Sequence, residues 1–130
     1  MESLIVHLFS HTGLRPKVWK YLLRYALVHA TEDTLKKKRT EYETLLGNYW
    51  KLDNLSGSEK KIYSTIDGDV KRIGTEFNAA FKEEVLQLML RRMLYVWHMR
   101  HPASGYVQGM CDLVNPFLIV FLSEYLPLDT

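Results

Sequence analysis

The sequence predicts an all-α protein, because apolar residues recur at three- and four-residue spacing along most of the chain. No stretch alternates apolar and polar residues for long enough to indicate a β-sheet, and no internal repeat is visible. The 130 residues are 47% hydrophobic and 25% charged, and they include 8 Tyr, 5 Phe and 3 Trp. This balance is typical of one globular domain and argues against disorder.

The first two helices are expected over residues 15–30 and from Thr31 onward. Pro16 suits a first helical turn, where its missing N–H leaves no hydrogen bond unmade. The Thr31 hydroxyl can cap the second helix, and Glu32 and Asp33 favour the positive end of its dipole. The inward face of this second helix is predicted to hold Leu35, Tyr42, Leu45, Leu46 and Tyr49.

A loop at 54–58 leads into a predicted third helix. Ser56 and Glu59 have the spacing of a capping box, which favours a helix start there. Gly68 is expected to interrupt this helix, so that DGDVKRIG (67–74) forms an irregular loop.

The longest helix is expected over 77–101, and Pro102 ends it. After a turn at HPASG, Asn115 and Pro116 are predicted to cap and begin a last helix that continues through 117–126. That helix is apolar on nearly every side, so it needs cover. We expect self-association of the chain through 117–126 or burial in a larger domain.

Charge and cysteine content exclude several classes of protein. Lys+Arg 17 against Asp+Glu 15 gives a net charge of +2, too small to indicate nucleic acid as the main partner. A single cysteine, Cys111, excludes an internal disulfide. The N-terminus lacks the basic region of a signal peptide, and the most apolar stretch, 113–128, is interrupted by polar residues. We therefore expect no transmembrane segment and a cytoplasmic protein.

Arg72 is the first candidate for chemistry. It lies between Gly68 and Gly74, close to Asp67 and Asp69. A planar, permanently charged guanidinium can enter a partner's site and neutralise charge on a transferred phosphate. The alternative is a surface arginine paired with Asp69.

Gln108 is the second candidate. It lies between Gly105 and Gly109, where glycines allow another backbone to come close. A glutamine amide can accept a hydrogen bond from water and donate one to a phosphate oxygen. The alternative is a turn glutamine bonded to its own loop.

Other reactive side chains favour structural roles. His98 and His101 are too few to make a metal site, and we predict none. No family signature surrounds Cys111, so a structural thiol is expected there rather than a nucleophile. The charge run at 35–39 is typical of a solvated helix face. Three tryptophans are expected in the core: Trp19, Trp50 and Trp97.

Three segments, in order, resemble the TBC domain, the all-helical family of Rab GTPase-activating proteins. GLRPKVWKYLL (13–23) is similar to the family's opening motif. Ile66, Asp69 and Arg72 reproduce its IxxDxxR spacing, and the segment 106–109 reproduces YxQG. HPASGYVQG further resembles the branch known as TBC domain family member 22. The motif region covers about 13–126.

The resemblance implies a role for each matching residue. Arg72 would be an arginine finger and Gln108 a glutamine finger, both supplied in trans to a Rab-family small GTPase. Asp69 and Tyr106 would hold these two segments, and Gly109 would permit close approach. GTP and magnesium would be carried by the partner, so this chain would need no cofactor. The protein would act at the periphery of endomembranes. Structural positions of the motifs are Arg15, Trp19 and Ile66.

Two departures from the family pattern favour an alternative function. After Arg72 the family usually has a proline two residues on, and this chain has none; Cys111 replaces an asparagine that is common after the glutamine. The chain is also shorter than the family's domains, so 1–130 is expected to be an N-terminal part without the C-terminal helices. A catalytically silent scaffold or effector that binds a GTPase or a membrane-traffic partner is therefore the second hypothesis, and a helical dimer with accidental motif matches is the third.

Overall fold

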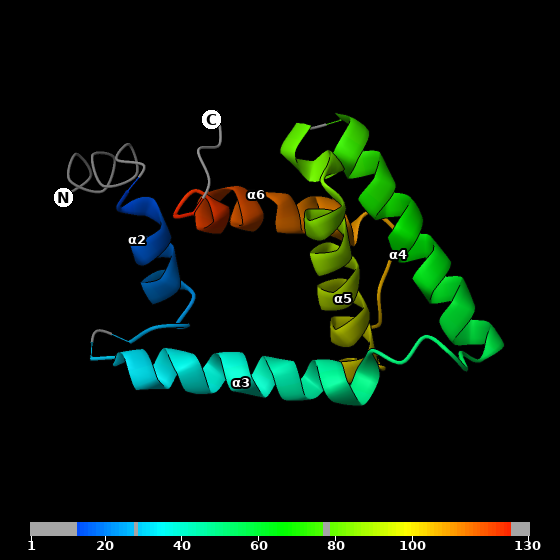
Figure 1. Cartoon of the computed structure of the whole chain (residues 1–130), viewed down its shortest axis with the longest axis horizontal. Coiled ribbons are helices and arrows are strands. Elements are labelled where there is room, and N and C mark those ends of the chain that lie inside the picture. Colours follow the sequence, from blue (N-terminus) through cyan, green and yellow to red (C-terminus); the bar gives the residue numbers. More distant parts are fainter. Residues whose placement is uncertain (1–12, 28, 77–78, 126–130) are drawn as a thin grey trace. The chain divides into compact units, whose positions relative to one another are not determined.

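A computed structural model describes residues 13–27, 29–76 and 79–125, and these contain five α-helices, one 3₁₀ helix and no strand (Figure 1). The predicted all-α class is confirmed. Two compact units divide the chain: one holds Thr40–Val114, and the other holds the described residues up to Arg39 and from Asn115 onward. The elements are α2 (Arg15–Leu22), α3 (Glu32–Tyr49), α4 (Gly57–Glu76), η1 (Ala79–Lys82), α5 (Glu84–Arg100) and α6 (Met110–Leu122).

The first helix is shorter than predicted. α2 ends at Leu22, and Arg24 has a positive φ of 56° that no helix can contain. Trp19 lies edge-on to Phe117, with ring centroids 5.3 Å apart. Lys20 forms an ion pair of 2.8 Å with Glu124 in the same unit.

The start of α3 agrees with the sequence, and so does most of its predicted inward face: Leu35, Leu45, Leu46 and Tyr49 are half-buried, whereas Tyr42 is exposed. The Thr34 backbone N–H donates to Thr31 Oγ1 over 3.4 Å, which confirms the N-cap. No residue of α3 is buried, and Tyr42 is 36% exposed. The charge run is a solvated face as expected, with Lys38 Nζ lying 5.2 Å from the centre of the Tyr25 ring.

The helix α4 contains the segment that we expected to be a loop. The capping box is confirmed: Ser56 N donates to Glu59 Oε2 over 2.7 Å, and Glu59 N donates to Ser56 Oγ over 3.3 Å. The helix then continues through Gly68 to Glu76, so the prediction of a loop at 67–74 is wrong. A glycine costs about 1 kcal/mol in a helix. Burial of an apolar face outweighs that cost, and this face holds Ile66, Val70 and Ile73, all fully buried.

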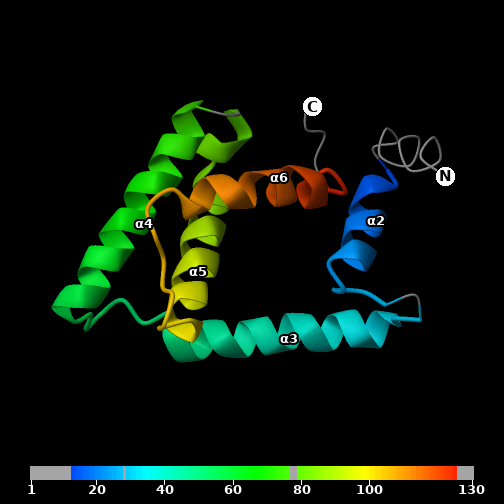
Figure 2. The ribbon, with the colours of Figure 1, turned by 180° about the vertical axis from the view of Figure 1, so that it is seen from behind.

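The helix predicted over 77–101 begins later than expected, and α4 is the longer helix. Phe77 lies outside the described residues, and Phe81 is buried in η1. The end of α5 at Arg100, before Pro102, is confirmed. α4 and α5 run side by side (Figures 1 and 2), and their core includes the fully buried Leu90 and a cluster of the aromatic rings of Trp50, Tyr63 and Tyr95.

The last helix begins earlier than predicted. α6 starts at Met110 and contains Pro116, so Asn115 and Pro116 do not form its cap and first turn. Asn115 is buried, and within the described residues its amide atoms have no hydrogen-bond partner. Leu118 and Val120 are buried, while Phe117 is 37% exposed. The apolar surface available for self-association is thus smaller than the sequence indicates, and self-association stays a prediction.

The three tryptophans are half-buried, so the expectation that they lie in the core holds only in part. Across the described residues, we find no helix with the length and apolar character that crossing a membrane requires.

Candidate functional site

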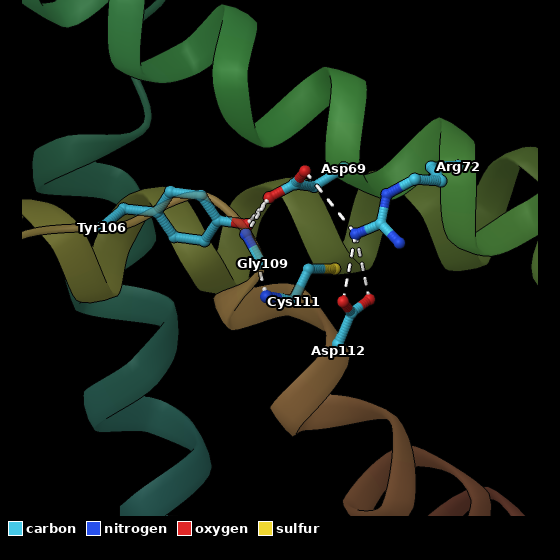
Figure 3. A network of polar contacts seen from close by, with 6 residues as sticks. All are labelled: Asp69, Arg72, Tyr106, Gly109, Cys111 and Asp112. Carbon is cyan, nitrogen blue, oxygen red and sulfur yellow. Dashed lines mark hydrogen bonds and ion pairs between the residues drawn. The ribbon is translucent and has the colours of Figure 1, made fainter.

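A buried carboxylate ties α4 to the turn that precedes α6. Asp69 is 3% exposed, and its Oδ2 accepts hydrogen bonds from the Tyr106 hydroxyl at 2.5 Å and from the Gly109 backbone N–H at 2.8 Å (Figure 3). A buried charge is costly unless donors surround it, and these two donors meet that need. All three residues lie in the unit 40–114, so the arrangement belongs to one compact part of the chain.

Tyr106 is protonated and serves as a fixed donor. Burial is the main cause that raises the pKa of its hydroxyl well above the ordinary value, and the neighbouring Asp69 carboxylate raises it further. The same hydroxyl oxygen accepts a hydrogen bond of 3.3 Å from the Cys111 backbone N–H. Tyr106 therefore connects Asp69 to the first turn of α6.

Glycine is required at Gly109 by the backbone conformation. Its φ is +92°, a region that residues with a side chain rarely adopt. This conformation directs the backbone N–H to Asp69. The role predicted for Gly109 was close approach of a partner; here the positive φ explains why the residue is a glycine.

The two histidines hold the turn and do not gather into a metal site. His98 Nδ1 accepts a hydrogen bond of 2.8 Å from the Tyr106 backbone N–H. His101 Nδ1 lies 2.8 Å from the Trp97 carbonyl oxygen. In the described part of the chain, no three His, Cys, Asp or Glu side chains are placed to hold a metal ion.

Arg72 lies on α4, not on the loop that we predicted. Its side chain is 37% exposed, and Nη2 lies 3.1 Å from both carboxylate oxygens of Asp112 (Figure 3). The distance from Nη2 to Asp69 Oδ1 is longer, 3.8 Å. Arg72 is therefore paired with Asp69, as the alternative interpretation predicted, but Asp112 lies closer to it.

Asp112 was missed by sequence reasoning. It is not among the candidate residues named from the sequence, which predicted that the last helix begins at Asn115. Its position four residues after Gln108, in the first turn of a helix, is the signal that could have found it, since an aspartate there favours the helix dipole.

Gln108 is exposed, and within the described residues its amide has no hydrogen-bond partner. The alternative of a glutamine bonded to its own loop has no support there. Tyr106, two residues before Gln108, and Gly109, the residue after it, are both bonded to Asp69. Asp69 thus brings the Gln108 segment to the helix that carries Arg72.

Cys111 is a structural thiol, as expected. Its side chain is fully buried, and burial, followed by the charges of Asp69 and Asp112, raises its pKa to about 12. A thiol with this pKa is not a nucleophile near neutral pH. The motif residue Ile66 is fully buried three residues before Asp69 on the same helix, and Arg15 and Trp19 are half-buried on α2.

The fold and the site define an all-helical domain. In it the buried Asp69 carboxylate joins α4, which carries Arg72, to the turn that carries Gln108. The chain belongs to the Rab-GTPase-TBC domain family, whose model matches residues 12–128. The resemblance found in the sequence motifs is therefore confirmed.

Relatives of this family are similar over most of the chain. GTPase-activating protein gyp1 of Schizosaccharomyces pombe is 45% identical over 86% of the chain, and TBC1 domain family member 22B of Homo sapiens is 38% identical over 89%. The crystal structure of the Ypt/Rab-GAP domain of Gyp1p matches with a TM-score of 0.77 and 38% identity, over 89% of this chain and 36% of that one. The chain spans only 22–23% of the length of the two relatives.

Proposed function

We propose that this chain is part of a GTPase-activating protein that acts on a Rab-type small GTPase and supplies Arg72 and Gln108 in trans. Membership of the Rab-GTPase-TBC domain family and the similarity to the GTPase-activating protein gyp1 support this activity. The observation that carries the proposal is the buried Asp69, which lies on the helix that bears Arg72 and accepts hydrogen bonds from Tyr106 and Gly109, one on each side of Gln108 in the sequence.

The chemistry requires a cation and a water-orienting amide at a foreign nucleotide. Charge develops on the phosphate oxygens during GTP hydrolysis, and an arginine supplied in trans accelerates the reaction by about 10³–10⁵. Arg72 would neutralise that charge, and the exposed Gln108 amide would orient the attacking water. GTP and magnesium would be held by the GTPase, and this chain would need no cofactor of its own.

The proposed partner also sets the proposed place of action. Rab-type GTPases as substrates imply work in the cytoplasm, at the periphery of endomembranes. The C-terminal helices that the family's domains are expected to have would complete the groove that receives the GTPase, and this stays a prediction.

The test measures GTP hydrolysis by a panel of GTP-loaded Rab GTPases with and without the purified protein. Arg72→Ala and Gln108→Ala should each remove most of the stimulation, with unchanged circular dichroism. Arg100→Ala, which removes an exposed arginine from the end of α5, is the matched control and should keep full stimulation. Full activity of Arg72→Ala, or no stimulation of any Rab by the wild-type protein, rejects the proposal.

A second function, a silent scaffold or effector, is favoured by one contact. Arg72 Nη2 is engaged by the chain's own Asp112, and the protein would be silent if a bound GTPase left the guanidinium held in this pair. Binding to a GTP-loaded GTPase with no change in its turnover would select this function over activation.

A further inference from the structure

We propose that Asp112 is a positioning residue that orients the Arg72 guanidinium from α6 and thereby raises the maximal rate of stimulated hydrolysis. The proposal rests on the proposed function, because it concerns the same site. Asp112 is not one of the residues of the family motifs.

Asp69 alone does not fix the direction of Arg72. Its Oδ2 is occupied by the Tyr106 hydroxyl and the Gly109 N–H, and its Oδ1 lies 3.8 Å from Arg72 Nη2, too far for a hydrogen bond. Asp69 therefore attracts the guanidinium but does not fix its orientation. Asp112 does make hydrogen bonds to the guanidinium, and both of its carboxylate oxygens lie 3.1 Å from Nη2.

The contact also couples the two proposed fingers. Asp112 lies in the first turn of α6, four residues after Gln108, and Arg72 lies on α4. The segment that carries Gln108 is thus bonded to α4 by Asp69, which accepts from Tyr106 and Gly109, and the pair of Arg72 and Asp112 follows directly after it (Figure 3). A shift of the Gln108 segment would move the guanidinium with it.

An oriented arginine is more effective than a mobile one, because its long side chain otherwise loses rotamer freedom when it meets the nucleotide. The effect is moderate, since the side chains of Arg72 and Asp112 are 37% and 40% exposed and water screens their attraction. We therefore expect several-fold changes in rate rather than the loss that follows removal of the arginine.

The first test varies Asp112 and measures stimulated hydrolysis against GTPase-activating protein concentration. Asp112→Ala should lower the maximal rate about three- to fivefold and leave the half-saturating concentration unchanged. Asp112→Glu should recover most of the rate, because it restores a carboxylate. Asp53→Ala, which removes an exposed aspartate in the same unit, is the matched control. Circular dichroism and urea unfolding check that each variant is folded.

The second test asks whether Asp112 acts through Arg72. In the Arg72→Ala background, Asp112→Ala should cause no further loss, since the group that it orients is gone. An undiminished loss in that background, an unchanged rate in the single variant, or a change in half-saturation alone overturns this proposal. These outcomes leave the proposed function intact, whereas a wild-type protein without activity overturns both.

Discussion

The hydroxyl of Tyr106 donates a hydrogen bond of 2.5 Å to the carboxylate of Asp69, and this contact joins positions 37 residues apart in the sequence. Asp69 is buried on α4, and Tyr106 is buried in the turn before α6. Neither side chain is free to interact with a partner. Their role is to fix where the neighbouring exposed residues, Arg72 and Gln108, are presented.

Removal of the Asp69 carboxylate should destabilise the chain strongly. Asp69→Ala leaves the Tyr106 hydroxyl and the Gly109 N–H without their acceptor, and each buried donor that loses its partner costs about 1–3 kcal/mol. We expect the free energy of unfolding to fall by about 3 kcal/mol in urea denaturation. Tyr106→Phe keeps the ring but removes the hydroxyl that donates to Asp69 and accepts from the Cys111 N–H, so it should cost about 2 kcal/mol. Asp53→Ala should stay within about 0.5 kcal/mol of wild type, and equal stability of Asp69→Ala and Asp53→Ala would contradict the structure.

The two glycines Gly109 and Gly68 should respond in opposite directions to alanine. Gly109 has a φ of +92°, so a methyl group there strains the backbone although no atom lies within 4 Å. We expect Gly109→Ala to cost about 1–2 kcal/mol. Gly68 is exposed in the middle of α4 with open space around it, so Gly68→Ala should stabilise by up to about 1 kcal/mol. Thermal unfolding of both variants beside wild type checks the pair, and a lower melting temperature for Gly68→Ala would show that the helix does not pass through this position.

The thiol of Cys111 should be unreactive in the native chain. Burial raises its pKa from 9.0 to about 12, so it remains a neutral thiol at pH 8. A folded pKa above the unfolded value means that this group contributes stability below about pH 9 and that the contribution is lost as pH rises toward 12. Labelling with a disulfide reagent at pH 8 should be slow for the native protein and fast in urea. Fast labelling of the native protein would show that the first turn of α6 is open.

The sequence predicted the all-helical class and the family more accurately than the element boundaries. Capping residues with a local mechanism, such as Ser56 and Glu59, were placed correctly because their hydrogen bonds involve only near neighbours. Gly68 was taken as a helix end, since a glycine's local cost is visible in the sequence and the burial of Ile66 and Val70 is not. Pro116 was misplaced for a similar reason: a proline is typical of a first turn, but here it lies inside α6.

Those boundary errors affected the site. When 67–74 is interpreted as a loop, nothing in the structure explains why Ile66, Asp69 and Arg72 are spaced three residues apart. On a helix it places a buried apolar residue, a buried carboxylate and a half-exposed guanidinium along one side. The pairing of Arg72 with Asp112 spans 40 residues, and no local pattern indicates it.

Acid should weaken α4–α5 packing through Asp67, which lies on α4. Its Oδ1 is 2.6 Å from Arg91 Nε, and its Oδ2 is 2.7 Å from Lys71 Nζ. Partial burial raises the pKa of this carboxyl, but the hydrogen bonds and charges of Lys71 and Arg91 outweigh it, so the pKa lies below the ordinary value. A lowered folded pKa contributes stability above the unfolded value of about 3.9, and that stability is lost as pH falls through the folded pKa.

Urea unfolding between pH 3 and 7 should therefore show a smaller pH dependence for Asp67→Asn than for wild type, with a loss of about 1 kcal/mol at pH 7. Asp53→Asn, at an exposed position, should keep the wild-type dependence, and a wild-type slope in Asp67→Asn would mean that this carboxylate does not link the two helices.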